Sequence, residues 1–291
     1  MFRLGYNTNG LAHHRPLEAL RLLSDLGYEG MALTPDVGQL DPFVHDPVAV
    51  GELRELSEEL GMQLAIETGA RYVLDPRQKH YPTLLEQLGV ERQRRVDFLR
   101  RSIDLAHALG AKVVSLWAGA APHGQVGDAD SPDEDGEEIW DRLVEGVGLV
   151  LAHASGSGVD VAFEPEPGMF LERPRGYDEL RRRLGSEGDE LRLCLDVGHL
   201  LCTGDLPVGD VIRRYGSQLA QVHLDDIKDG VHDHRMFGTG DLDLPEALGA
   251  LLEVGYQGMA AVELSRDSHR GPLAAEEAME HLLLALEQSP R

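Results

Sequence analysis

Short apolar runs of strand character alternate with amphipathic segments along this chain. The segments between the runs carry apolar residues at helical spacing, for example Leu99, Ile103 and Ala106. Alternating strands and helices build a parallel sheet, because each helix returns the chain to start another parallel strand. This alternation constrains the fold more than any other feature. The expected strands span residues 3–7, 30–34, 62–67, 112–117, 159–164, 191–196, 219–224 and 258–264.

Eight such units fit a closed barrel better than an open sheet. No G-x-G-x-x-G fingerprint of a dinucleotide-binding sheet follows the first strand. The length of 291 residues suits one large α/β barrel, which commonly needs about 250 residues. We therefore predict a (β/α)8 TIM barrel that forms a single domain over residues 1–291.

Composition excludes several classes of partner. The formal net charge of −24 opposes binding to phosphate polymers, so we expect no nucleic acid partner. The same charge either concentrates cations near the protein or only keeps the protein soluble. No stretch approaches the roughly 20 apolar residues of a membrane span, and the first residues lack the pattern of a secretory signal. We expect a cytoplasmic protein, with Cys194 and Cys202 as reduced thiols and a homo-oligomer as an open alternative.

Four polar residues, Glu164, Asp196, His223 and Glu263, each lie at or near the end of an expected strand. In a parallel barrel the carboxyl ends of the strands meet at one face, where active sites form. Three carboxylates and one imidazole at that face favour a hard or borderline divalent ion. The sequence therefore predicts one metal site made by these four residues.

Further polar and aromatic residues accompany the four. Glu166 follows Glu164 in Glu-Pro-Glu-Pro-Gly, and period-two alternation places both carboxylates on the same strand face. His199 follows Asp196 at a spacing that lets it reach over the same site. Trp117 offers either an apolar wall to a substrate pocket or ordinary barrel packing.

The order of these residues resembles the xylose isomerase-like barrel superfamily, and within it the sugar isomerase and epimerase branch. That branch includes tagatose 3-epimerases, hydroxypyruvate isomerases and inosose enzymes. The resemblance covers the whole chain and is strongest over residues 159–271. It implies one divalent ion, with Mn²⁺ first and Mg²⁺, Co²⁺ or Zn²⁺ as alternatives. It also implies contacts to a sugar or keto-polyol substrate from His199, His234, Arg235 and Lys228.

The chemistry that the resemblance implies is proton transfer beside a carbonyl. A metal ion acting as a Lewis acid stabilises the negative charge of an enediolate. Glu164 and Glu263 would serve as base and acid on opposite sides of the substrate. Return of the proton to the opposite face gives epimerisation, whereas its transfer to the neighbouring carbon gives isomerisation.

Three rival functions remain open on the sequence. A dehydratase or lyase acting on a keto-polyol begins with the same proton abstraction. Endonuclease IV shares the barrel, but strands three and four here end at Glu67 and Trp117, where that enzyme carries histidines. Binding of a second metal ion by His199, His232 and His234 is still compatible with the sequence. A barrel that binds sugar without catalysis is the third rival, and it would need no metal.

The long connection over residues 118–136 is acidic and follows the fourth expected strand. Loops on the functional face of a barrel often cover the site. A solvated insertion is an equal alternative for this segment.

Overall fold

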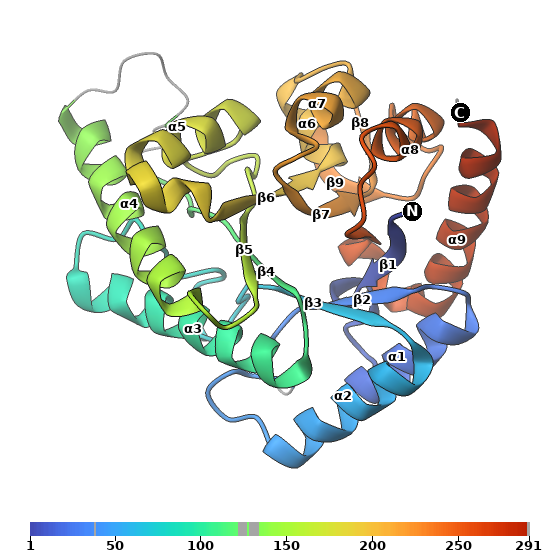
Figure 1. Ribbon diagram of the computed structural model, residues 1–291, viewed down its shortest axis with the longest axis horizontal. Helices are drawn as coiled ribbons and strands as arrows, with labels where there is room; N and C mark the ends of the chain where they lie inside the picture. Colours follow the sequence, from blue (N-terminus) through green and yellow to red (C-terminus); the bar gives the residue numbers. More distant parts are fainter. Residues whose placement is uncertain (38, 122–126, 128–133, 290–291) are drawn as a thin grey trace. The chain divides into compact units, whose positions relative to one another are not determined.

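The computed structural model describes residues 1–37, 39–121, 127 and 134–289, and it contains eight parallel strands at the expected places. The strands form a closed barrel in the order β1-β10-β7-β6-β5-β4-β3-β2, which confirms the predicted fold class (Figure 1). Each strand lies within two residues of its predicted bounds. They are β1 (Arg3–Asn7), β2 (Gly30–Leu33), β3 (Gln63–Glu67), β4 (Val113–Leu116), β5 (Asp160–Phe163), β6 (Leu191–Asp196), β7 (Leu219–Leu224) and β10 (Met259–Val262).

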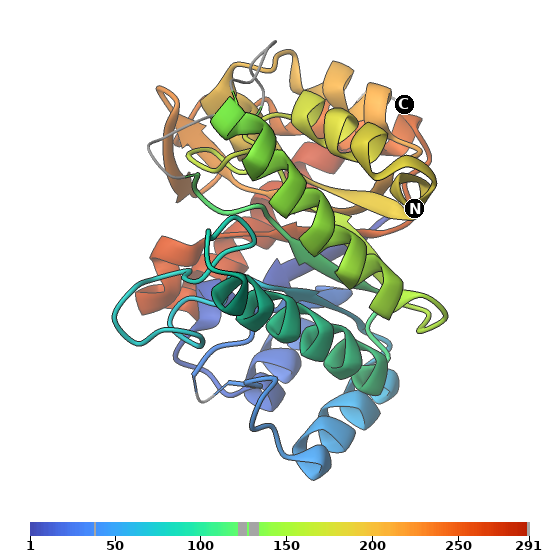
Figure 2. The same cartoon turned by 90° about the vertical axis from the view of Figure 1, so that its left-hand side faces the viewer.

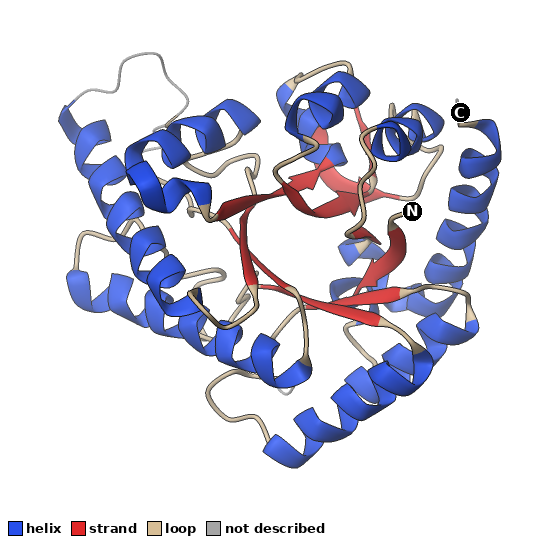
Figure 3. Ribbon diagram, viewed as in Figure 1, coloured by secondary structure: helices blue, strands red, loops and turns tan. Residues whose placement is uncertain are grey.

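Helices follow the strands along the chain, as Figure 3 shows by colour. Local signals set their ends: Gly110, at a φ of 72°, closes α3, and the Asp243 side chain accepts a hydrogen bond from Glu246 N at the start of α8. The α-helices are α1 (Pro16–Asp25), α2 (Pro47–Leu60), α3 (Gly89–Leu109), α4 (Glu134–Ala154), α5 (Pro174–Leu184), α6 (Val197–Thr203), α7 (Val208–Tyr215), α8 (Leu244–Glu253) and α9 (Gly271–Gln288). Short 3₁₀ helices span η1 (Thr8–Leu11), η3 (Gly185–Asp189) and η4 (Ser265–Arg270).

Two compact units make up the chain. The first unit comprises Met1–Leu33, Glu55–Ala65 and Leu193–Arg291, and the second comprises Thr34–Arg54 and Ile66–Arg192. The first unit therefore contains β1, β2, β7 and β10, with the start of β3 and the part of β6 from Leu193 onward. The second contains β4 and β5 with the end of β3.

In the core of the first unit, one methionine occupies the space that two glycines leave free. Met259 of β10 lies against two glycines, Gly5 of β1 and Gly30 of β2. A Cβ atom added to Gly5 would lie 2.4 Å from the Met259 sulfur, and one added to Gly30 would lie 2.7 Å from it. The volume of the thioether thus fills space that side chains on the two neighbouring strands would need.

The second unit packs its long helices α3 and α4 against each other, and they run side by side in Figures 1 and 2. The α4 residue Trp140 is buried, with its ring 5.2 Å from that of Phe170 in an edge-to-face arrangement. Arg95 of α3 is fully buried, and its Nη2 donates to the carbonyl oxygen of Thr68 at 2.9 Å. This buried guanidinium also lies over the ring of Trp117.

A small antiparallel hairpin lies between β7 and α8. Its strands are β8 (Asp226–Lys228) and β9 (Val231–Arg235). The Asp226 carboxylate accepts hydrogen bonds from the backbone nitrogens of Gly240, Leu242 and Ile227, at 2.8 to 2.9 Å. One buried carboxylate therefore connects the hairpin to the segment that follows it.

No helix of the described residues is both long and apolar enough to cross a membrane. The middle of the acidic connection, including residues 128–133, lies outside the described residues.

Candidate active site

Asp196 lies at the end of β6 and also begins helix α6. Its Oδ1 accepts a hydrogen bond from the backbone nitrogen of His199 at 3.0 Å. Its Oδ2 is buried and has no hydrogen-bond partner among the described residues, although His199 Nε2 lies 3.6 Å away. Burial acts to raise the pKa of Asp196, but the nearby imidazoles of His199 and His234 outweigh it and lower the pKa. The result is an ionised, buried carboxylate with one oxygen available to a cation.

The pairing of β6, β7 and β10 brings His223 and Glu263 to the same region. His223 lies directly opposite Asp196 in the register of β6 and β7, and Glu263 N donates to Leu224 O at 2.9 Å. His223 Nδ1 lies 3.0 Å from Glu263 Oε2, and Asn9 Nδ2 donates to Glu263 Oε1 at 2.7 Å. Burial acts to raise the pKa of Glu263, but the hydrogen bond from His223 lowers it strongly.

These donors suit a divalent cation. Asp196, His223 and Glu263 offer ligand atoms within 4.8 Å of one another, and all three side chains are largely buried. Gln221 also contacts the imidazole, because its Nε2 lies 2.9 Å from His223 Nε2. The orphaned Asp196 oxygen and the oxygen-rich donor set fit the predicted metal.

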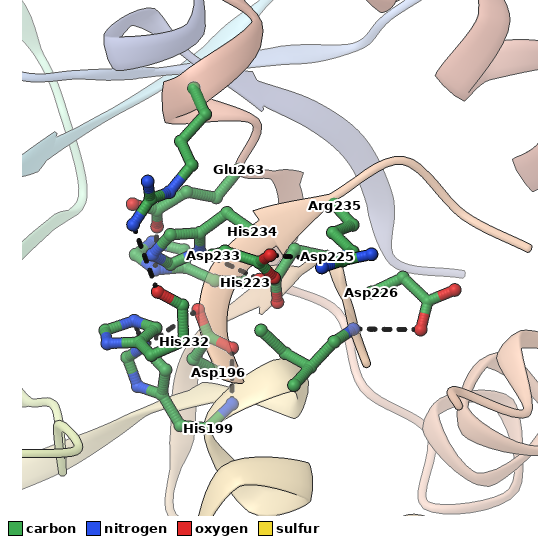
Figure 4. A network of polar contacts seen from close by, with 12 residues as sticks. Asp196, His199, His223, Asp225, Asp226, His232, Asp233, His234, Arg235 and Glu263 are labelled. Atoms are coloured by element: carbon green, nitrogen blue, oxygen red, sulfur yellow. Dashed lines mark hydrogen bonds and ion pairs between the residues drawn. The ribbon is translucent and has the colours of Figure 1, made fainter. Parts of the chain in front are cut away.

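Three histidines form a second cluster beside Asp196, as Figure 4 shows. His199 Nε2 lies 3.1 Å from His232 Nε2, and the ring centroids of His232 and His234 are 4.6 Å apart. Burial, together with the two neighbouring imidazoles, lowers the pKa of His232 to about 4. His199, His232 and His234 could also hold a cation, because their ring nitrogens lie within 4.8 Å of one another.

Asp225 orients one of these histidines. His234 Nδ1 lies 2.8 Å from Asp225 Oδ2, and Asp225 is fully buried. Burial opposes a charge on His234, but the Asp225 carboxylate outweighs it and raises the pKa of His234. Gly198 makes room for this carboxylate, because a Cβ atom there would lie 2.1 Å from Asp225 Oδ1.

Two predicted substrate-binding residues contact acidic partners of their own. Lys228 Nζ forms an ion pair with Asp241, and Arg235 Nε forms one with Asp233 Oδ2 at 2.7 Å. The side chains of Lys228 and Arg235 are 43% and 41% exposed. The structure therefore brings His199 and His234 together but not these two cations, whose contact with substrate stays a prediction.

The remaining predicted residues, Glu164, Glu166 and Trp117, lie in the second unit. Glu164 directly follows β5 and is buried, and its backbone nitrogen donates to Leu116 O at 2.8 Å. Glu166 is partly exposed in the turn after it. Trp117 follows β4 and is buried. Glu164 and Trp117 directly follow the ends of β5 and β4, whereas Glu166 lies in the turn beyond β5 and not on the strand face predicted for it.

Several polar residues at the site were not predicted from the sequence. Asn9, Gln221 and Asp225 contact the side chains of Glu263, His223 and His234. For Asn9 and Asp225, positions just after β1 and β7 were the available signal, whereas Gln221 lies inside β7. An Asn in a polar turn or a Gln inside a strand is too common to single out.

The chain belongs to the xylose isomerase-like TIM barrel family, whose model matches residues 20–285. This membership confirms the resemblance inferred from the ordered strand-end residues.

Among curated proteins, the chain is 26% identical over 298 residues to fructoselysine 3-epimerase of Shigella flexneri, a match covering 100% of this chain and 99% of that protein. It is also 26% identical over 185 residues to inosose dehydratase of Lacticaseibacillus casei. That match covers 56% of this chain and 61% of the dehydratase, so it spans only about three fifths of the relative. The enzyme names of these relatives confirm the prediction of an enzyme.

Solved structures share the fold over nearly the whole length. An L-ribulose 3-epimerase superposes with a TM-score of 0.76 at 22% identity, covering 99% of this chain and 95% of that chain. An IolI protein with a bound zinc atom gives 0.78 at 18% identity, covering 99% of both chains.

Proposed function

We propose that this protein is a divalent-metal-dependent epimerase or isomerase of a ketose or keto-polyol. This proposal rests on the buried Asp196 oxygen, which has no hydrogen bond from the described residues and lies beside the His223–Glu263 pair. A lone ionised oxygen is costly to bury unless a cation or hydrogen-bond donor satisfies it. The full-length match to an epimerase supports the reaction class.

We assign the metal to Glu164, Asp196, His223 and Glu263, with Mn²⁺ as the first choice. When bound, a divalent ion of this kind supplies Lewis acidity that stabilises negative charge on the oxygens beside the reacting carbon. The zinc atom in the IolI structure supports a metal in a protein of this fold. Gln221 and Asn9 would hold two of the ligands in place through their bonds to His223 and Glu263.

Glu164 and Glu263 are the proposed proton carriers. One carboxylate removes the proton from the carbon next to the carbonyl, and the carboxylic acid on the other side returns a proton. His199 and His234 would hydrogen-bond the hydroxyl and carbonyl oxygens, with His234 oriented by Asp225. Glu166, Trp117, Lys228 and Arg235 are proposed to contact other parts of the substrate.

Solvent exchange tests the reaction directly. Metal-loaded protein in deuterated water should incorporate deuterium beside the carbonyl of one member of a panel of free and phosphorylated ketoses, inososes and hydroxypyruvate. Glu164→Gln and Glu263→Gln should each lower that rate at least 100-fold, because an amide cannot accept the proton. Glu253→Gln is the control, since Glu253 is exposed and pairs only with Arg213 among the contacts described. Full exchange in either site variant would contradict the two-carboxylate mechanism.

Dehydration of a keto-polyol is the second candidate. The matches to inosose dehydratases favour it, although they cover only part of each chain. The same exchange experiment separates the two, because a dehydratase yields a product that has lost water, whereas an epimerase yields one that keeps all heavy atoms of the substrate and carries deuterium.

The relatives named above support a small sugar substrate. The cytoplasmic location, the absence of a nucleic acid partner and a possible homo-oligomer stay predictions.

A further inference from the structure

A cavity of about 440 Å³ lies within the second unit, at the carboxyl ends of its strands. Its wall combines an aromatic and apolar side with polar groups. The proposed proton transfer does not use this cavity. The lining residues that matter here are Lys79, His80, Thr83, Glu86, Trp117 and Met169.

His80 lines this cavity and carries a hydrogen-bond acceptor on its ring. Its Nδ1 contacts the carbonyl oxygen of Gly69, and because a carbonyl only accepts, Nδ1 must carry the proton. In the neutral ring Nε2 is then unprotonated, and it has no partner among the described residues. Burial lowers the pKa of His80 to about 4, with Lys79 and Arg95 acting in the same direction, so the ring is neutral near pH 7.

Trp117 forms the aromatic side of the cavity and is held rigidly. The His80 ring meets it edge-on, with centroids 5.3 Å apart and planes at 89°. The Arg95 guanidinium lies over the indole, 4.3 Å from the ring centroid, and does not line the cavity. A buried cation against the ring fixes the position of the indole, which suits a stacking surface.

The cavity adjoins the proposed base, Glu164, inside the same unit. Leu116 and Phe163 are paired in the register of β4 and β5, so Trp117 and Glu164 follow neighbouring positions. The loop after Glu164 returns to the cavity, where Met169 N donates to Glu166 O at 3.0 Å. A substrate bound at Glu164 can therefore extend into this cavity.

The charges on the cavity wall do not favour an anion. Among the described residues that line it, Lys79 and Glu86 are the charged ones, and they cancel. The unprotonated His80 Nε2 accepts hydrogen bonds and repels a phosphate oxygen. The wall instead fits a group with O–H donors and C–H faces.

We propose that this cavity binds the uncharged, hydroxyl-bearing end of the substrate, with His80 Nε2 accepting a hydrogen bond from a hydroxyl and Trp117 packing against its C–H groups. The inference rests on the proposed function and narrows its substrate class to sugars or polyols without phosphate at that end.

Tryptophan fluorescence tests the binding without catalysis. In a Trp140→Phe background, Trp117 is the remaining tryptophan, because the chain has two. Titration with D-fructose as the free ketohexose should change the emission saturably. The 6-phosphate should bind at least tenfold more weakly. If Trp140→Phe is unstable, saturation-transfer NMR on the same two ligands replaces fluorescence.

Two histidine variants decide the role of His80. His80→Ala should weaken ketohexose binding about five- to tenfold, the effect of one lost hydrogen bond. His107→Ala is the matched control, since His107 Nδ1 also contacts a backbone carbonyl, that of Ser157 at 2.8 Å, outside the cavity. Unchanged binding in His80→Ala, absence of ketohexose binding, or tighter binding of the phosphate would overturn the proposal. Binding that depends on His80 without deuterium exchange would contradict the proposed reaction and leave the pocket standing.

Discussion

Several of the polar side chains around Asp196 contact one another. Asn9 and His223 hold Glu263, Gln221 holds His223, and Asp225 holds His234. Asp196 Oδ2 is among the buried oxygens without a hydrogen bond from the described residues. Removing the charge of that oxygen should therefore affect a bound cation more than the protein fold.

Calorimetric titration of metal-stripped protein with Mn²⁺ measures this effect. We expect one tight site in the unmodified protein and at least tenfold weaker binding in Asp196→Asn, because the amide offers a weaker ligand. Asp205→Asn serves as the control, since Asp205 accepts from Thr203 Oγ1 instead. Absence of Mn²⁺ binding up to millimolar concentrations would contradict the metal-dependent function.

The lowered pKa of His80 predicts a specific pH dependence of the free energy of unfolding. Because its pKa falls to about 4 in the folded protein, the unfolded chain binds more protons between pH 4 and its ordinary value of 6.5. The stability it contributes is complete above pH 6.5 and is lost as the pH falls toward 4. Between pH 7 and pH 5 the unmodified protein should lose about 2 kcal/mol more unfolding free energy than His80→Gln. Urea unfolding of both proteins at each pH measures the difference, and equal losses would refute it.

At the scale of elements, the strands deliver the site residues and the connections after them complete it. Asp196 and His223 are adjacent because β6 and β7 pair in register. His232 and His234 arrive on β9, a strand whose position depends on the bonds from Asp226 to the following loop. The hairpin is therefore a structural requirement for the histidine cluster.

Asp226→Ala should loosen this hairpin. Loss of three backbone hydrogen bonds to a buried carboxylate should lower the unfolding free energy by about 3 kcal/mol, since each bond to a charged group contributes on the order of 1 to 3. Urea unfolding measures the loss, and limited proteolysis should show faster cleavage over residues 228–242. Asp229→Asn, at an exposed position in the hairpin turn where φ is 55°, is the control, because Asn tolerates the left-handed conformation. A stability equal to that of the unmodified protein would contradict this role.

At the scale of the whole molecule, the formal net charge of −24 acts against the folded state through self-repulsion. We expect the thermal midpoint to rise by several degrees between 20 and 200 mM NaCl, because salt shortens the range of repulsion between exposed charges. Measurements with sucrose at matched osmolality control for solute exclusion. A midpoint independent of salt would mean that local ion pairs offset the repulsion.

The family model extends across both compact units, from residue 20 to residue 285. We propose on this basis that the chain forms one domain, as the alternation of strands and helices predicts.

The amino-acid sequence by itself determined the strands, the barrel and the residues that end β6, β7 and β10, because the period of apolar residues and their spacing are local properties. It also placed Asp196 and His199 correctly, since the strand end and the helix start are consecutive in the chain. Only the tertiary structure decided which partners those residues have. The bonds from Asn9 to Glu263 and from Asp225 to His234, the hairpin held by Asp226, and the neutral ring of His80 against Trp117 all depend on burial and on contacts between distant segments. No local pattern encodes such contacts, because their energies arise only when the packed chain removes water from the groups that make them.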